Sequence, residues 1–225
     1  MAWNDPVSHK ESAARPAAGP ITSRDNPLIK EYARLAADAA FRRESGLFAL
    51  EGARLCADAA ASGAAVRTVL YTARAAEQYG AYLGPLLSVC PDCREITAPL
   101  AGRLSDTQTP QGIFCICRRL DNRLPLGKIK RNGRYLLLED VQDPGNLGTI
   151  VRTAEAFGID GLFLTAGCCD LYNPKVLRGS MGGVLRLASA RTEDPSGLLA
   201  CLREKGLSAF ACVADAGARP VQQTR

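Results

Sequence analysis

The chain has 225 residues, of which 47% are hydrophobic and 23% charged, and its formal net charge is +5. This composition allows a buried core in one large domain or two small ones, and the mild positive charge permits an anionic partner such as RNA without requiring one. The sequence lacks an apolar run of about 18 residues, so we expect no membrane-spanning helix. Residues 1–20 lack the apolar stretch of a secretory signal, and we expect them to form a flexible tail.

Alternating helix and strand patterns predict a small α/β domain at residues 21–120. In chain order we expect a helix at 27–44, a strand at 47–50, a helix at 53–61, a strand at 66–71, a helix at 72–82, and strands at 94–97 and 112–118. The polar and basic segment 121–133, which Pro and Gly interrupt, is typical of a linker between domains.

A second α/β domain is predicted at residues 134–225. Its patterns indicate strands at 135–138, 162–164 and 207–213, and helices at 146–157, 174–180 and 197–205. Strands that are joined by helices in this order form a parallel sheet. We therefore expect an α/β fold in which a parallel-sheet domain follows a smaller one.

The loop after the strand at 135–138 is the first candidate for chemistry. It turns on Asp143, Pro144 and Gly145, and we expect Asn146 to cap the next helix. In a parallel α/β sheet such loops commonly bind ligands, and a helix start suits a phosphate or carboxylate. Arg152 lies about 1.7 turns further on, so both side chains can border one cleft. Taken alone, a β-turn with a helix cap and a solvated arginine is the simpler explanation.

A second cluster surrounds the helix at 174–180. Asn173 and Pro174 are typical of a helix start, and Lys175 and Arg178 are three residues apart and so share a face. Two cations near a glycine-rich exit suit a phosphodiester, although a capped surface helix with solvated charges is the simpler explanation in isolation. The sequence has neither GxGxxG nor GxxxxGK[ST], so no nucleotide fingerprint supports the α/β assignment.

The histidine and cysteine residues limit which side chains can transfer protons or bind a metal. The only histidine, His9, lies in the expected tail, so proton transfer in the folded region must use carboxylates, Lys, Arg, Tyr or the substrate. Nine cysteines without a signal peptide indicate a reducing compartment, and we expect a cytoplasmic protein. Cys90 and Cys93 with Cys115 and Cys117 offer four zinc ligands. The last two lie in an alternating apolar strand and are better explained as core residues, so we expect no metal.

Residues 139–165 and 171–187 together resemble the first motif region of the SpoU/TrmH family of RNA methyltransferases, within the SPOUT class. Residues 21–55 and 105–117 resemble the substrate-binding domain that often precedes the catalytic one. The resemblance implies methyl transfer from S-adenosylmethionine to a ribose 2′-hydroxyl of ribosomal or transfer RNA. It also implies a knotted α/β domain that forms a homodimer.

The resemblance also assigns residues. Asn146 and Arg152 match the family's motif Asn and Arg and are the expected catalytic residues. A guanidinium has a pKa of roughly 12.5 or more, so we expect Arg152 to hold the phosphate beside the target ribose and to stabilise the developing alkoxide. The expected RNA-binding residues are Glu51, Arg54, Lys175 and Arg178. For Glu51 and Arg54, which match an EG-x-R signature, a strand-to-helix turn with solvated side chains is an equal alternative.

Two family motifs have no counterpart before Arg225, namely a Gly-Glu-Gly-type loop and a later segment that holds the donor and closes the knot. We therefore expect the donor-binding residues beyond Arg225, and a piece of a longer methyltransferase rather than a degenerate relative. The 225-residue chain by itself should be impaired in methyl transfer. Two alternatives remain: a non-catalytic RNA-binding module, which the basic residues of 121–133 favour, and a metabolic α/β enzyme with an anionic substrate near Asn146.

Overall fold

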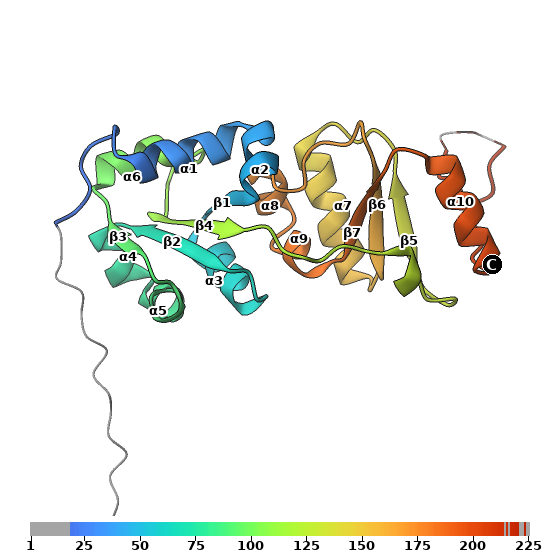
Figure 1. The fold of residues 1–225 in the computed structure, drawn as a ribbon, viewed down its shortest axis with the longest axis horizontal. Coiled ribbons are helices and arrows are strands. Elements are labelled where there is room, and N and C mark those ends of the chain that lie inside the picture. The colour runs from blue at the N-terminus through green and yellow to red at the C-terminus, as the bar shows by residue number, and fades with distance from the viewer. Residues whose placement is uncertain (1–18, 214, 216, 221–222, 224–225) are drawn as a thin grey trace, which may run out of the picture.

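Two sheets lie one after the other along the long axis of the molecule (Figure 1). The computed structural model describes residues 19–213, 215, 217–220 and 223, so almost all of the tail predicted at 1–20 lies outside the described residues. The chain is of the α/β class, as its sequence predicts. Within the described part, no helix has the length and apolar character needed to cross a lipid bilayer.

The first sheet has the strand order β1-β4-β2-β3. Its strands are β1 (Leu47–Glu51), β2 (Val66–Tyr71), β3 (Cys93–Glu95) and β4 (Ile113–Arg118). β4 runs antiparallel to β1 and β2, while β3 runs parallel to β2. Successive side chains of a strand face opposite sides of its sheet. Phe48 and Cys115 accordingly join the core on one face, whereas Ala49 and Phe114 join the core on the other.

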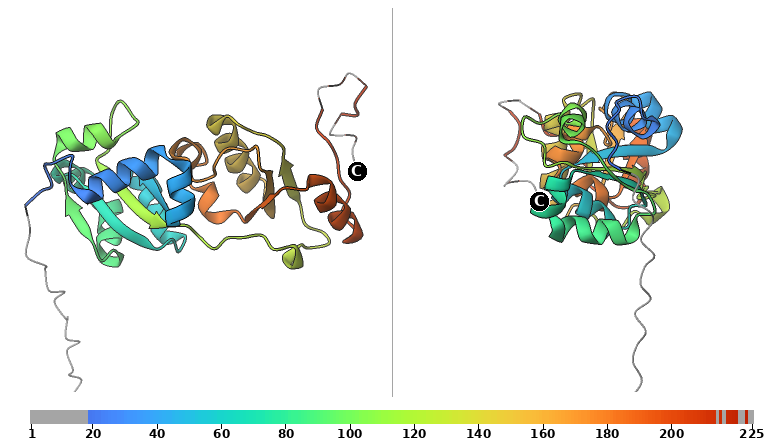
Figure 2. Two further views of the ribbon diagram at one scale, coloured as in Figure 1. Left: turned by 45° about the horizontal axis from the view of Figure 1, so that its top comes forward. Right: turned by 90° about the vertical axis from the view of Figure 1, so that its left-hand side faces the viewer.

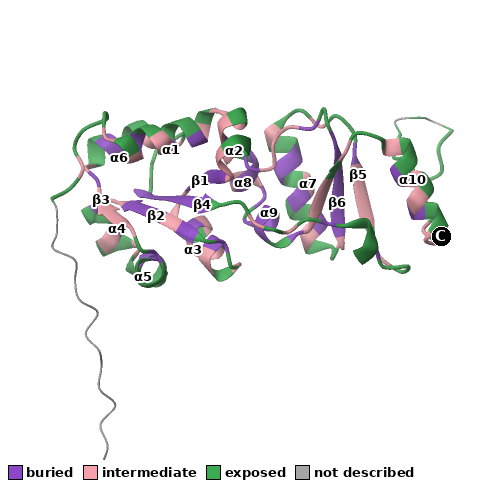
Figure 3. Ribbon diagram, in the orientation of Figure 1, coloured by how far each residue is buried: buried purple, intermediate pink, exposed green. Residues whose placement is uncertain are grey.

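Helices cover both faces of the first sheet (Figure 1). Ile29, Tyr32 and Leu35 of α1 (Pro27–Ala37) pack on one face together with Leu100 of α6 (Ala98–Leu104). The other face is covered by α3 (Ala53–Ala61), α4 (Ala73–Gln78) and α5 (Gly80–Val89). The burial pattern follows this layering, because β1, β2 and β4 are mostly buried, the edge strand β3 is half-buried, and the helices expose their outer sides (Figure 3).

The second sheet is parallel, in the order β5-β6-β7. Its strands are β5 (Tyr135–Leu138), β6 (Gly161–Thr165) and β7 (Ser189–Thr192). The helices of this half are α7 (Pro144–Ala156), α8 (Pro174–Gly179), α9 (Gly183–Arg186) and α10 (Pro195–Glu204). Leu162 and Leu164 of β6 pack in one core with α7, and Phe163 packs in another with Leu198 and Leu202 of α10.

The predicted linker is packed against the second sheet. The segment runs alongside that sheet before it reaches β5 (Figure 2) and forms a short 3-10 helix, η1, at Leu126–Lys128. Leu124 and Ile129 are buried with Phe163, and Arg123 forms an isolated parallel bridge to Ser189 of β7. Polar composition alone did not reveal the two apolar residues that hold this segment in place.

Two predicted helices are each divided in the structure. The helix expected at 27–44 stops at Ala37, because the Asp38 side chain accepts hydrogen bonds from the amides of Ala40 and Phe41 and so caps α2 (Ala39–Ser45). Asp favours such caps over helix interiors. The helix expected at 72–82 is divided at Tyr79 into α4 and α5.

The strand predicted at 207–213 is wrong. Within the described chain this segment forms no strand, and Phe210 and Val213 are exposed. The third strand of the sheet is β7 instead, which has a weak apolar pattern because it is an edge strand whose residues are half-buried or exposed. A strand needs a partner ladder, and only the tertiary fold supplies one.

Candidate functional site

Helix α7 carries both expected catalytic side chains. It begins at Pro144, because the Asp143 carboxylate accepts a hydrogen bond of 2.7 Å from the amide of Asn146. The prediction that Asn146 caps this helix is therefore wrong. Asp143 followed by Pro144 is the stronger start signal, since Pro favours the first helical position. Asn146 lies in the first turn with an exposed side chain.

The loop that leads into α7 is held from neighbouring strands. Asp140 has a left-handed φ of 49°, and the Thr165 hydroxyl accepts from its amide at 3.0 Å and donates to its carboxylate at 2.7 Å. The Arg191 guanidinium donates to the carbonyls of Thr165, Cys168 and Cys169. These contacts order the carboxyl edge of the sheet, the usual ligand edge of a parallel α/β fold.

Arg152 is exposed on α7, and its Nη1 lies 3.8 Å from the sulfur of Met181. No salt bridge is formed by Arg152 among the described residues. Met181 follows α8 and has a left-handed φ of 50°, which is unusual for a side chain of this size. The Arg152 guanidinium is therefore available to pair with an anion, and the side chain beside it is that of Met181.

Arg178 of α8 faces the first domain. Its guanidinium lies 3.0 Å from a carboxylate oxygen of Asp106 and 3.8 Å from one of Glu51. Lys175, on the same helix, is exposed instead. The sequence predicts both as RNA contacts, but the fold gives them different surroundings.

Glu51 lies at the end of β1 and is mostly enclosed, with a side-chain exposure of 11%. Its carboxylate accepts hydrogen bonds from the hydroxyls of Ser105 and Thr107 and from the amide of Asp106. The alternative in which Glu51 is a solvated residue of a turn is therefore wrong. The carboxylate ties the loop after α6 to both β1 and Arg178.

The next residues explain the EG-x-R pattern. Gly52 has φ of 105°, a backbone conformation that residues other than glycine rarely adopt. It precedes α3, whose first amide, that of Ala53, donates to the side-chain oxygen of Gln111 at 2.8 Å. Arg54 is exposed, and no ion pair involving it occurs in the part of the chain that is described.

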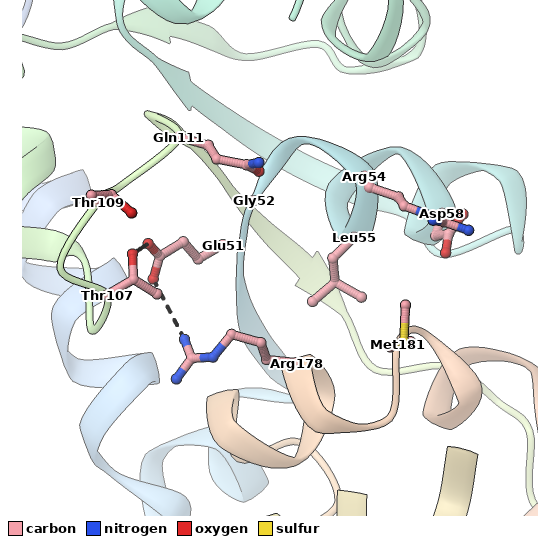
Figure 4. A pocket seen from close by; sticks show the side chains of 10 residues that line it. All are labelled: Glu51, Gly52, Arg54, Leu55, Asp58, Thr107, Thr109, Gln111, Arg178 and Met181. Atoms are coloured by element: carbon pink, nitrogen blue, oxygen red, sulfur yellow. Dashed lines mark hydrogen bonds and ion pairs between the residues drawn. The ribbon is translucent and has the colours of Figure 1, made fainter. Parts of the chain in front are cut away.

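These residues surround one cavity of about 340 Å³ at the junction of the two domains (Figure 4). Arg54 and Leu55 reach it from α3, Arg178 and Met181 from α8 and the turn after it, and three residues from the loop before β4, which are Thr107, Thr109 and Gln111. Of the four residues predicted to bind RNA, Glu51, Arg54 and Arg178 line the cavity, whereas Lys175 does not.

Several lining residues were not predicted as site residues. Asp58, Thr107, Thr109 and Met181 are brought to the cavity by the packing of the two domains, although all but Asp58 lie in segments that resemble the family. For Thr107, Thr109 and Gln111, the similarity of residues 105–117 to the family's substrate-binding domain was the available signal.

The two walls of the cavity are held together by further arginines. Arg186 of α9 contacts Asp58 at 3.6 Å and Glu155 at 3.0 Å, and it donates to the Met181 carbonyl at 3.2 Å. The hydrogen bond to the Glu155 carboxylate raises the pKa of the Arg186 guanidinium above its ordinary value. Both carboxylates that line the cavity, Glu51 and Asp58, are thus matched by arginines.

The cysteines do not join this site. Cys115 and Cys117 are fully buried in the core with Cys56, as the packing interpretation predicts. Cys93 donates a hydrogen bond of 3.5 Å from its thiol to the Cys90 carbonyl. Among the described residues, no group of three or more Cys, Asp or Glu side chains is arranged to hold a metal ion.

These features define an α/β protein whose two domains enclose a mixed apolar and cationic cavity next to an exposed arginine. Comparison with known proteins gives the family. Residues 133–224 match the SpoU rRNA Methylase family, and residues 26–115 match the MRM3-like substrate binding domain. The chain belongs to the SpoU family of RNA methyltransferases, as residues 139–165 and 171–187 predict.

Similar proteins agree with this assignment. An uncharacterised tRNA/rRNA methyltransferase of Synechocystis sp. is 33% identical over 87% of this chain and 70% of its own length. The 23S rRNA (guanosine(2553)-2′-O)-methyltransferase of Bacillus subtilis is 29% identical over 90% of this chain and 76% of its own length. The AdoMet-bound structure of an rRNA methyltransferase from Sinorhizobium meliloti has a TM-score of 0.70 at 27% identity, over 83% of this chain and 69% of that one.

Proposed function

We propose that this chain carries the RNA-facing part of a methyltransferase that modifies a ribose 2′-hydroxyl of ribosomal or transfer RNA, with S-adenosylmethionine as the methyl donor. The observation that supports it best is the exposed, uncompensated Arg152 on α7 beside the junction cavity. Relatives that are named as 2′-O-methyltransferases of 23S rRNA favour this function over a non-catalytic RNA-binding module, and favour ribosomal RNA as the substrate.

The roles of the two α7 side chains follow from their chemistry. The Arg152 guanidinium pairs with the phosphate beside the target ribose and stabilises the negative charge that develops on the 2′-oxygen. The Asn146 carboxamide, which both donates and accepts hydrogen bonds, orients the ribose. S-adenosylmethionine supplies the methyl group when bound. A 2′-hydroxyl is present in RNA and absent from DNA, so the substrate is RNA.

The catalytic role of Arg152 is tested in a version extended by the family's two later motifs. We expect Arg152→Ala to lower the rate of methyl incorporation into ribosomal RNA by roughly 10²- to 10³-fold, the usual effect of removing one donor to a developing oxyanion. Arg203→Ala on α10, which removes another arginine that is exposed, is the matched control and should keep the rate. A rate for Arg152→Ala within threefold of the parent would contradict the role.

The binding site of the methyl donor is tested separately from the role of Arg152. We assign no described residue to S-adenosylmethionine, and the location of its binding residues beyond Arg225 stays a prediction. Isothermal titration of the 225-residue chain with S-adenosylmethionine tests it. We expect no binding in the micromolar range, and micromolar binding would show that the donor site is held within this chain.

Two further parts of the proposal concern the whole protein. We propose a homodimer and a cytoplasmic location, the second because nine free thiols suit a reducing compartment. Sedimentation of the extended version measures the oligomeric state, and a fluorescent fusion reports the cellular location.

A further inference from the structure

The junction cavity suggests what the two domains bind together. We propose that it receives a single unstacked nucleotide of the RNA substrate, with the base between Leu55 and Met181 and the flanking phosphates at Arg54 and Arg152. This inference rests on the proposed function, because that function makes RNA the ligand. RNA is most often read through such splayed bases, which contact apolar and guanidinium surfaces in the protein.

The charges around the cavity support a nucleotide rather than a bare anion. Each carboxylate that lines it already faces an arginine: Glu51 faces Arg178, and Asp58 faces Arg186. Within the described residues neither Arg54 nor Arg152 forms an ion pair, and the Arg152 guanidinium donates a hydrogen bond to the Met181 sulfur. The paired arginines hold the walls, so the two uncompensated ones are the cations left for phosphates.

The walls and the size fit one base. Leu55 and Met181 point toward each other across the opening, from α3 and from the turn after α8 (Figure 4). A volume of about 340 Å³ lies at the small end of the range for small-molecule sites, which is roughly 300–1,000 Å³. This volume admits one nucleoside and not a stack of bases.

The third wall can read the edge of a base. Thr109 and Gln111 are exposed at the cavity. The Gln111 side-chain oxygen already accepts from the Ala53 amide, which fixes the orientation of its carboxamide and leaves its NH₂ group for a ligand. Hydroxyl and amide groups that a second contact has positioned are suited to hydrogen bonding with a base.

Met181 joins the cavity to the catalytic helix. Its left-handed backbone is held by the hydrogen bond from Arg186 to its carbonyl. Its sulfur lies on the Arg152 guanidinium, so a base against Met181 places its own phosphate near Arg152. Met181 therefore connects the cavity to the proposed catalytic arginine, Arg152.

The test uses the ¹⁵N-labelled 225-residue chain and two kinds of probe, the four ribonucleoside 5′-monophosphates and inorganic phosphate. We expect the monophosphates to shift the amide signals of Gly52, Leu55 and Met181 in a saturable way, with a dissociation constant in the millimolar range. Phosphate alone should leave Leu55 and Met181 unmoved. Unmoved cavity amides with all four nucleotides, or the same shifts with phosphate alone, would overturn the proposal.

Two variants localise the binding. Leu55→Trp fills the cavity and Met181→Ala removes one wall without touching the core, since Met181 is 51% exposed. We expect each to weaken nucleotide binding by about tenfold, while Leu126→Trp, at an exposed leucine that does not line the cavity, should leave it unchanged. Wild-type affinity in both cavity variants would overturn the site.

The outcomes also separate this inference from the proposed function. If nucleotides enter the cavity but the extended protein methylates no RNA, the methyltransferase proposal fails and the site stands. If the extended protein methylates RNA but nucleotides do not enter the cavity, only this inference fails.

Discussion

At the scale of single residues, the arginines of the junction form two groups. Arg178 and Arg186 are paired with carboxylates of the first domain, whereas Arg54 and Arg152 are not. Removing one partner of an enclosed ion pair is costly because the other charge is left without compensation, whereas an exposed charge contributes little to stability. The two groups should therefore respond differently to substitution.

We expect Glu51→Gln to lower the free energy of unfolding by about 1–3 kcal/mol, because it removes the charge that Arg178, Ser105 and Thr107 contact. Arg54→Ala should change it by no more than about 0.5 kcal/mol, since Arg54 is exposed. Urea denaturation measures both. Equal losses would show that the distinction between the two groups is wrong.

Burial of Cys117 makes stability depend on pH. Desolvation in the core raises the pKa of the Cys117 thiol when the chain is folded, while an unfolded cysteine ionises near pH 8.5. The folded chain therefore binds more protons above that pH. This contribution to stability is complete below about pH 8.5 and is lost as the pH rises toward the folded pKa.

We expect the free energy of unfolding to fall above pH 8.5, with a share from Cys117 of about 1.4 kcal/mol per pH unit. Cys117→Ala should make the slope shallower by that amount. Urea titrations at several pH values between 7 and 10, with a reducing agent, measure it. Identical slopes in the two proteins would rule out the Cys117 contribution.

At the scale of elements, the crossing of α7 and α8 depends on two glycines. A Cβ on Gly148 would lie 3.0 Å from both the Gly179 Cα and the Val176 carbonyl oxygen. Backbone atoms cannot move aside as a side chain can, so any side chain at Gly148 separates the two helices. These helices carry Arg152 and Arg178, and the close crossing sets the distance between them.

We expect Gly148→Ala to be destabilising by about 1–3 kcal/mol, because overpacking outweighs the gain of up to about 1 kcal/mol in helix propensity. Gly102→Ala in α6 is the matched control. Nothing lies within 4 Å of a Cβ there, so it should be neutral or stabilising. Thermal and urea unfolding compare the pair, and a stabilising Gly148→Ala would disprove the tight crossing.

At the scale of the whole molecule, the two domains share a core. The Phe48 ring of β1 lies 4.7 Å from the Tyr172 ring before α8, between their centroids. Beside it the buried Arg42 of α2 donates to Asp170 at 2.7 Å and to the Leu35 carbonyl at 2.6 Å. An enclosed ion pair of this kind is costly to break at one side, because the remaining charge stays buried.

We expect Asp170→Asn to lower the free energy of unfolding by about 3–5 kcal/mol. Asp121→Asn removes the partner of Arg123 in a pair with side-chain exposures of 80% and 86%, and it should cost no more than about 1 kcal/mol. Denaturation of both variants measures the contrast. A small loss for Asp170→Asn would mean that the Arg42 contact does not join the domains.

The sequence by itself determined the class, the family and most elements. Short apolar runs predict β1, β2, β4, β5 and β6 closely, because strands that are covered on both faces are apolar along most of their length. Asn173 caps α8 as predicted, since a cap involves only neighbouring residues. The motif region around Asn146 and Arg152 identified the family, and the catalytic roles of these two residues stay predictions.

The tertiary structure alone decided how the charges are used. Only the fold brings Glu51 to Arg178, Asp58 to Arg186 and Arg42 to Asp170, across separations of roughly 130 residues. It also decided that β7 completes the sheet and that the linker packs against it. The physical reason is that a local pattern records burial, whereas an ion pair or an edge strand depends on a partner that lies far away in the chain.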